Sequence, residues 1–247
     1  MNFACVEYGK DEGVGNNLFN YSWARIHSEN MGFKLKHSGI SDLNILPTNE
    51  DKECSINLTK SQNFLQDFNL YKNHIEQIKS WDIWNPITDV NSKDLVIHLR
   101  AGNRFVARNA KYSPTANDFE KIFKDIDFDR LHIVTNMKKT TKWNLDDIKE
   151  LKKKLKLKGG DGVTAEMYQR KDYPFLTDEE ALDYTNSQIE CFNNYDPIWI
   201  NGNVYDDFNY LRSFKKILFP RSTLSWWAAI TGVANEVYVY GPWAPHK

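Results

Sequence analysis

The stretch KDLVIHLRAGN (93–103) decides the fold expected for this chain. It begins with polar residues, continues through the apolar run 95–97, and presents His98 and Arg100 just before Gly102. A short β-branched run that closes on a glycine predicts a buried strand ending in a loop. Ligands of open α/β sheets bind outside the carboxyl ends of the strands, so Arg100 is expected to face a binding site. A solvated arginine at an ordinary strand end is the alternative.

Length and charge limit the number of domains and the kinds of binding partner. The chain has 247 residues, enough for one large domain or two small ones. A net charge of −1 and a pI near 6.6 exclude a global attraction to nucleic acid or anionic membranes, so an anion-binding site must be local. Aromatic residues make up 14% of the chain, which is common in proteins that bind sugars, although most of these rings are expected in the core.

The cysteines and the apolar runs bear on the compartment. Cys5, Cys54 and Cys191 are odd in number, widely spaced and free of any CxxC pattern, which indicates a reducing compartment and argues against structural zinc. The N-terminus does not resemble a signal peptide, and no apolar run has the length of a membrane span. The sequence therefore predicts a cytoplasmic protein that would reach a membrane, if at all, through its acceptor.

The N-terminal segment predicts the opening of a βα unit. The apolar run 3–8 is followed by the glycine-rich GKDEGVGNN (9–17) and by apolar residues at helical spacing over 18–26. Gly13 and Gly15 would allow the backbone to approach a ligand, and the helix N-terminus would favour an anion. The third glycine of the dinucleotide-binding fingerprint is missing.

A linker is expected in the middle of the chain. Before it, the pattern predicts in turn a short strand, irregular loops with one short strand, and a helix, over residues 32–36, 41–63 and 64–84. The polar, proline-containing segment 85–92 then separates an N-terminal domain (1–92) from a C-terminal domain (93–247).

Strands and helices alternate in the second half. Strands are expected at 131–135, 198–200, 216–219 and 236–240. Helices are expected at 117–124, 145–157, 181–192 and 206–212. This alternation indicates an α/β architecture with parallel sheets. The lysine run 152–158 is interpreted as a solvated helix face, because leucines interleave with it.

The segment 221–229 places hydroxyl groups at an expected strand-to-helix junction. Ser222, Thr223 and Ser225 lie beside a tryptophan pair. Hydroxyl groups and free N–H groups at a helix start are suited to binding phosphate. An ordinary N-capped helix with a tryptophan pair in the core is the alternative, and local evidence favours it.

A DxD-like run occupies 125–129, and metal-dependent glycosyltransferases hold a divalent ion with such carboxylates. Here the run precedes a predicted strand instead of following one, so a helix exit and turn is the favoured interpretation. The histidines outside the opening stretch show no metal-ligand spacing.

Four of these segments resemble, in order, the motifs of the α-1,2-fucosyltransferases. GVGNNLFNYSWAR (13–25) resembles the family's G-x-G-N-Q-x-F-Q-Y, and VIHLRAGN (96–103) is similar to its H-x-R-x-G-[D/N]. STLSWWAAITG (222–232) resembles S-S-F-S-W-W-x-A, and IVTNM (133–137) stands where the family has a strand ending in a polar pair. The order and the approximate spacing agree.

The resemblance implies a GT-B fold, in which two Rossmann-like domains face each other across a cleft and the C-terminal one holds the donor. It also implies an inverting transfer of L-fucose from GDP-fucose to a hydroxyl of a glycan acceptor, with no metal cofactor.

The resemblance also assigns residues. Arg100 would contact the donor diphosphate, His98 would support it, and Asn16 would reach the cleft from the other domain. The donor-binding positions would be Gly15, Gly102, Asn103, Thr135, Asn136, Asp207, Ser222, Thr223 and Ser225.

Physical chemistry is consistent with this assignment. Negative charge grows on the leaving diphosphate, and a fixed guanidinium stabilises it without Mg²⁺. Glycosyl transfer passes through an oxocarbenium-like state, so leaving-group stabilisation can matter more than a strong base. Glu7, Asp11 and Glu12 are candidate bases by position alone.

Three positions depart from the family pattern. Asn103 replaces a common acidic residue, Asn136 stands where Asp is frequent, and Asn17 replaces Gln. Two alternatives therefore stay open: the same scaffold with another nucleotide-sugar donor, and a non-catalytic carbohydrate-binding module.

Overall fold

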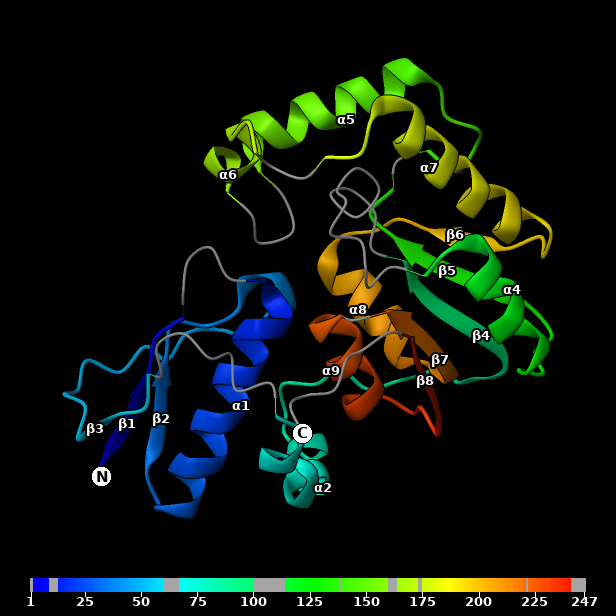
Figure 1. Cartoon of the computed structure of the whole chain (residues 1–247). Coiled ribbons are helices and arrows are strands. Elements are labelled where there is room, and N and C mark those ends of the chain that lie inside the picture. Colours follow the sequence, from blue (N-terminus) through cyan, green and yellow to red (C-terminus); the bar gives the residue numbers. More distant parts are fainter. Residues whose placement is uncertain are drawn as a thin grey trace.

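A computed structural model describes residues 2–8, 13–59, 67–99, 114–137, 139–159, 164–172, 175–220 and 222–240. These described residues form two parallel sheets with helices packed against them, as Figure 1 shows. The smaller sheet has the strand order β2-β1-β3, and the larger has the order β6-β5-β4-β7-β8. The predicted α/β class with parallel sheets is confirmed.

The smaller sheet is built on the predicted βα unit. Its elements are β1 (Phe3–Val6), α1 (Val14–Asn30), β2 (Lys34–His37) and β3 (Ile56–Asn57). All four residues of β1 are buried, because β1 is the central strand and pairs in parallel with both neighbours. The helix α1 crosses over from β1 to β2, which is the usual way to join parallel strands.

The predicted helix over 64–84 is wrong for the part that the structure describes. That part contains two 3₁₀ turns and one short helix: η2 (Phe68–Leu70), η3 (Lys72–His74) and α2 (Ile75–Lys79). The Asp67 carboxylate accepts the Asn69 N–H at 2.9 Å and starts η2. Tyr71 is fully buried and its hydroxyl donates to the Phe19 carbonyl at 3.0 Å. Tertiary contacts, not one helical stripe, explain the apolar residues here.

The larger sheet contains the opening stretch as its central strand. Its strands are β4 (Asn91–Leu99), β5 (Leu131–Thr135), β6 (Ile198–Ile200), β7 (Phe214–Pro220) and β8 (Glu236–Tyr240). The chain runs outward from β4 through β5 to β6, and then returns to place β7 on the other side of β4. The strand order therefore reverses between β4 and β7, which is where open α/β sheets bind their ligands.

Helices connect these strands along the chain. They are α4 (Ala116–Lys124), α5 (Leu145–Lys158), α6 (Ala165–Gln169), α7 (Asp178–Asn193), α8 (Val204–Arg212) and α9 (Thr223–Thr231), and the short η1 (Ser41–Leu43) lies between β2 and β3 of the smaller sheet. Most predicted helices agree with these bounds, and α6 is the addition. Asp125 caps the end of α4, so the DxD-like run forms the helix exit and turn that the sequence favoured.

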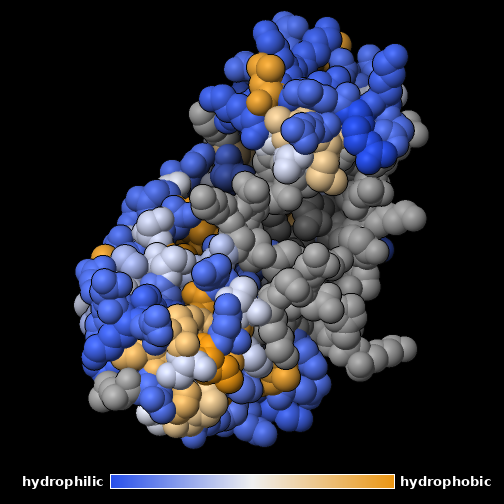
Figure 2. Space-filling view, turned by 90° about the vertical axis from the view of Figure 1, so that its left-hand side faces the viewer, coloured by the Kyte–Doolittle hydropathy of each residue, from blue (hydrophilic) through white to orange (hydrophobic). Residues whose placement is uncertain are grey.

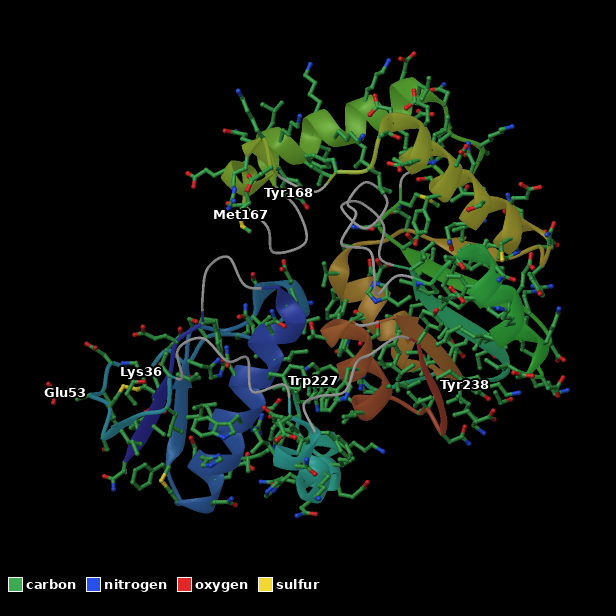
Figure 3. All side chains as sticks on the ribbon, viewed as in Figure 1. Lys36, Glu53, Met167, Tyr168, Trp227 and Tyr238 are labelled. Carbon is green, nitrogen blue, oxygen red and sulfur yellow. A yellow bond between two sulfur atoms is a disulfide. The ribbon has the colours of Figure 1, made fainter. Side chains whose placement is uncertain are left out.

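An aromatic cluster joins the two halves of the chain. The Phe19 ring of α1 lies 4.8 Å from Trp226 and 5.0 Å from Trp227 of α9, measured between ring centroids. Tyr71 lies 5.6 Å from Trp227, which is fully buried between α1 and α9 (Figure 3). Trp227 is therefore in the core, as the local pattern suggested, and the partly buried Trp226 packs against this core.

The cysteine interpretation needs a correction. Cys5 of β1 and Cys54 form a disulfide whose Cα atoms lie 5.8 Å apart, and Cys191 is free and buried. Pairing of β3 with β1 brings the segment containing Cys54 alongside Cys5. Sequence spacing carries no sign of this pairing, and the disulfide removes the basis for inferring a reducing compartment. Among the described helices, none is both long and apolar enough to cross a membrane.

A buried polar group crosses the larger sheet below its carboxyl edge. His132 of β5 places Nε2 at 2.9 Å from the Asp94 carboxylate of β4 and Nδ1 at 2.7 Å from the Tyr210 hydroxyl of α8. Asn91 Nδ2 donates to the same carboxylate at 2.7 Å. Burial raises the pKa of Asp94, but the hydrogen bonds from Asn91 and His132 outweigh it, and the net pKa lies below its usual value.

This group gives a pH prediction. The stabilisation from ionised Asp94 is complete above its unfolded pKa of about 3.9, and it is lost as the pH falls through the lower folded pKa. The wild type should therefore lose more unfolding free energy than Asp94→Asn as the pH falls below about 4. Urea titrations across this range measure it, with the exposed Asp125→Asn as control. Equal slopes for wild type and Asp94→Asn would contradict the assignment.

Candidate functional site

The reversal point between β4 and β7 brings distant polar side chains together. His98, near the end of β4, places Nδ1 at 3.1 Å from the Ser222 hydroxyl and in contact with the Ser225 hydroxyl. Ser222 follows β7, and Ser225 lies in the first turn of α9. The ring nitrogen can donate or accept, depending on the tautomer, and either way it links the end of β4 to the start of α9.

The serines are fixed by the start of α9. Ser222 is the N-cap residue, has an extended backbone, and accepts the Ser225 N–H on its side-chain oxygen at 3.4 Å. Ser222 is 2% exposed and Ser225 is 0% exposed. The sequence allowed an N-cap and a phosphate-binding loop at this junction, and the N-cap is confirmed. The contact with His98 is an additional feature that the local pattern could not reveal.

The first turns of α1 and α9 meet at this point. A Cβ atom on Gly15 would lie 2.4 Å from Thr223 Oγ1 and 2.5 Å from the Leu224 backbone nitrogen, so only glycine fits. Among the α-helices of the described residues, α1 and α9 alone lack an acidic residue in the first turn. Two positive helix ends without an internal counter-charge therefore lie together, which favours an anion.

Two further predicted residues lie at the same sheet edge. Thr135 ends β5 directly opposite Leu99 of β4, and Asn136 follows it. Thr135 is buried and its hydroxyl oxygen accepts the Met137 N–H at 3.1 Å, whereas Asn136 is exposed. Asn136 therefore lies exposed at the carboxyl edge, one strand away from His98, and Thr135 shapes the turn that contains it.

Asp207 is not brought against the histidine and serines by any contact among the described residues. It lies in α8 after the edge strand β6, and its carboxylate accepts the Gly202 N–H at 3.0 Å. Burial raises the pKa of the Asp207 carboxyl group, and the charge of the neighbouring Asp206 raises it further. The hydrogen bond from the Gly202 N–H lowers this pKa but does not cancel the rise. The hydrogen bond between Asp207 and Gly202 shapes the turn between β6 and α8.

The remaining predicted residues divide into two groups. Asn16 lies in the first turn of α1 beside Gly15 and is partly exposed. Glu7 follows β1, is exposed, and its N–H donates to the Thr59 hydroxyl at 2.9 Å. The other predictions fall outside the described residues, namely Arg100, Gly102, Asn103, Asp11 and Glu12.

Sequence reasoning missed the residue that anchors the far end of α9. The Arg212 guanidinium donates to the Thr231 carbonyl at 3.0 and 3.3 Å and to the Asn85 carbonyl at 3.1 Å. It also lies 5.7 Å from the Trp84 ring, and burial lowers its pKa to about 10. An arginine at the end of a helical pattern looks solvated, so its burial could not be predicted.

These contacts define an anion-compatible site at the carboxyl edge of the larger sheet. Within the described ranges, no group of three or more His, Cys, Asp or Glu side chains is arranged to hold a metal ion. Comparison of the chain with family models, curated proteins and solved structures gives no match.

Proposed function

We propose that the protein is an inverting glycosyltransferase that moves L-fucose from GDP-fucose to a glycan hydroxyl without a metal ion. The observation that carries the proposal is the contact of His98 with Ser222 and Ser225 at the reversal point of the larger sheet. Two segments that resemble separate fucosyltransferase motifs supply this contact, and the third, around Gly15, packs onto the same helix start.

The GT-B arrangement is part of the proposal. The smaller sheet with α1 would form the acceptor side, and the larger sheet would hold the donor. The start of β4 at Asn91 is compatible with a boundary near residue 92. The meeting of α1 with α9 would set the floor of the cleft between the two sides.

The proposed chemistry follows from the charges at the site. The diphosphate would lie over the N-termini of α1 and α9, where the helix dipoles stabilise negative charge. Arg100, two residues beyond His98 in the sequence, would stabilise the charge that develops as the bond to fucose breaks. His98 would then act as a positioning residue that ties β4 to α9.

The first test compares two arginine variants. Arg100→Ala should lower the rate of transfer about 100-fold, which is the usual effect of removing one group that stabilises developing charge. It should also weaken GDP binding while the unfolding temperature without ligand stays unchanged. Arg130→Ala is the control, because Arg130 is exposed just before β5, at the opposite end of the sheet.

GDP binding is measured by thermal shift and calorimetry in EDTA. Full GDP affinity and full transfer in Arg100→Ala would contradict the proposed role of Arg100. Absence of GDP binding by the wild type at millimolar nucleotide would contradict the donor assignment itself.

A further inference from the structure

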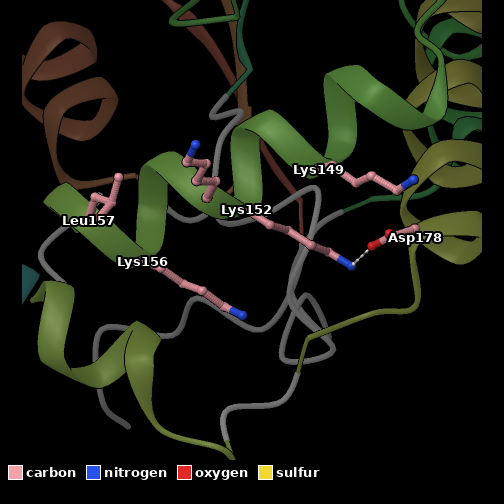
Figure 4. A pocket seen from close by; sticks show the side chains of 6 residues that line it. Lys149, Lys152, Lys156, Leu157 and Asp178 are labelled. Carbon is pink, nitrogen blue, oxygen red and sulfur yellow. Dashed lines mark hydrogen bonds and ion pairs between the residues drawn. The ribbon is translucent and has the colours of Figure 1, made fainter.

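The C-terminal half of α5 carries a local positive charge that the near-neutral chain does not share. Residues 149–158 include six lysines and one acidic residue, although the whole chain has a net charge of −1. Lys152 is neutralised by Asp178 at 2.6 Å and also donates to the Leu176 carbonyl (Figure 4). Among the ion pairs of the described residues, none involves Lys153, Lys154 or Lys158.

Apolar side chains of α5 and α6 are exposed. Ile148 and Leu155 face the core as the helical period requires, but Leu157 is 65% exposed on the opposite side of α5. Lys153 and Lys154 lie four and three residues before Leu157 and therefore flank it on the same face. Met167 of α6 is 45% exposed.

The two helices form one peripheral unit. Gln169 of α6 donates to the Lys156 carbonyl at 3.0 Å and holds α6 against the end of α5. Both helices lie at the periphery of the molecule, outside the two sheets, as Figure 1 shows. The lobe at the top of Figure 2, which contains α5 and α6, is mostly hydrophilic with small hydrophobic areas.

The lysines also border a recess. An open hollow of about 490 Å³ runs along α5 and is lined by Lys149, Lys152, Lys153, Lys156, Leu157 and Asp178. The Lys156 ammonium lies 5.5 Å from the Phe175 ring, and Figure 4 shows the Lys156 side chain extending away from α5. The exposed Lys149, Lys153 and Lys156 therefore surround one open recess.

We propose that the α5–α6 corner, defined as Lys153, Lys154, Lys156, Lys158, Leu157 and Met167, docks on an anionic lipid surface. Ammonium groups meet lipid phosphates while the lysine stems cover apolar surface, and Leu157 and Met167 enter the boundary between headgroups and acyl chains. A soluble polyanion would engage the lysines but would leave the two protruding apolar side chains in water. Docking is peripheral and reversible, and it does not depend on the proposed transferase activity.

The test is cosedimentation of the full chain with vesicles. We compare pure phosphatidylcholine with vesicles that contain about 30% phosphatidylglycerol, an anionic lipid. The wild type should bind only the anionic vesicles, and raising the salt should weaken this binding. The variant Lys153→Glu/Lys154→Glu should bind at least 25-fold more weakly, since each lysine near the surface contributes about fivefold and each glutamate adds repulsion.

Two further variants complete the design. Lys121→Glu/Lys124→Glu makes the same change of net charge at exposed positions in the last turn of α4 and should bind within about twofold of wild type. Leu157→Gln should weaken vesicle binding several-fold but leave binding to heparin, a soluble polyanion, unchanged. Thermal unfolding and GDP binding without vesicles verify that each variant is folded, and they report separately on the proposed function.

Several results would overturn the proposal. They are the absence of binding to anionic vesicles at low salt, equal binding to neutral vesicles, and an equal loss in the α4 control variant. An unchanged vesicle affinity in Leu157→Gln would instead assign the lysines to soluble polyanions.

Discussion

Replacing Gly15 with alanine is expected to lower the free energy of unfolding by about 3 kcal/mol, at the upper end of overpacking effects. The new methyl group would lie 2.4 Å from the Thr223 side-chain oxygen and 2.5 Å from the Leu224 backbone nitrogen. Backbone atoms cannot rotate aside, so α1 and α9 must separate. Urea denaturation measures the loss, and the residual folded protein should also bind GDP more weakly.

The chain provides a matched control two residues away. A methyl group on Gly13 would meet no atom within 4 Å, and Gly13 has a φ of −66°, which alanine adopts readily. Gly13→Ala should therefore cost less than about 1 kcal/mol. Thr223→Ser should not rescue Gly15→Ala, because the clash includes backbone atoms that serine keeps. Equal stability of the two glycine variants would contradict the contact between the helix starts.

Removing the disulfide is expected to lower the free energy of unfolding by about 4 kcal/mol in the chain-entropy model. Cys5 and Cys54 are 49 residues apart in sequence, so the bond restricts a long loop in the unfolded chain. Cys54→Ser should show this loss in guanidinium titrations without reductant. Dithiothreitol should destabilise the wild type by a similar amount and leave Cys54→Ser unchanged.

The third cysteine supplies the control. Cys191→Ser keeps the pair and should keep the full response to dithiothreitol, since Cys191 lies in α7 and is free. Thiol titration of the denatured, unreduced wild type should count one thiol, and the reduced protein should count three. Three thiols before reduction would show that the pair does not form.

Local signals explain the parts of the fold that the sequence predicted. The run 131–135 is a strand with the predicted bounds, because five consecutive buried positions suit the central part of a parallel sheet. The helix expected at 181–192 is α7, which begins three residues earlier at Asp178, because both hydrogen bonds of the Thr177–Glu180 capping box form within four residues of sequence. Such features depend on neighbours in the chain, and a single sequence contains them.

Long-range contacts explain what the sequence did not predict. The residues around Tyr71 read as one helix, but the burial of Tyr71 against α1 and α9 breaks them into short turns. The pairing of Cys5 with Cys54 depends on the register of β3 against β1. Gly15 was recognised as a glycine before a helix, but its partner Thr223 lies in the other half of the chain.

The candidate site, too, was predicted in part from the sequence and depends in part on long-range contacts. The resemblance to fucosyltransferases placed His98, Ser222 and Ser225 in one site, and the structure brings these three side chains into contact. No contact among the described residues brings Asp207 to these three side chains, because α8, which carries Asp207, begins beside the edge strand β6. Strand order decides which polar residues share an edge, and strand order cannot be deduced from local patterns.

The most direct test of the proposed function is nucleoside diphosphate release from a panel of GDP-, UDP- and ADP-sugars, with and without EDTA. The proposal predicts that GDP-fucose is turned over in preference to every other donor, and that EDTA leaves the rate unchanged. Turnover of another donor in its place, turnover that EDTA abolishes, or no turnover of any nucleotide sugar would contradict it.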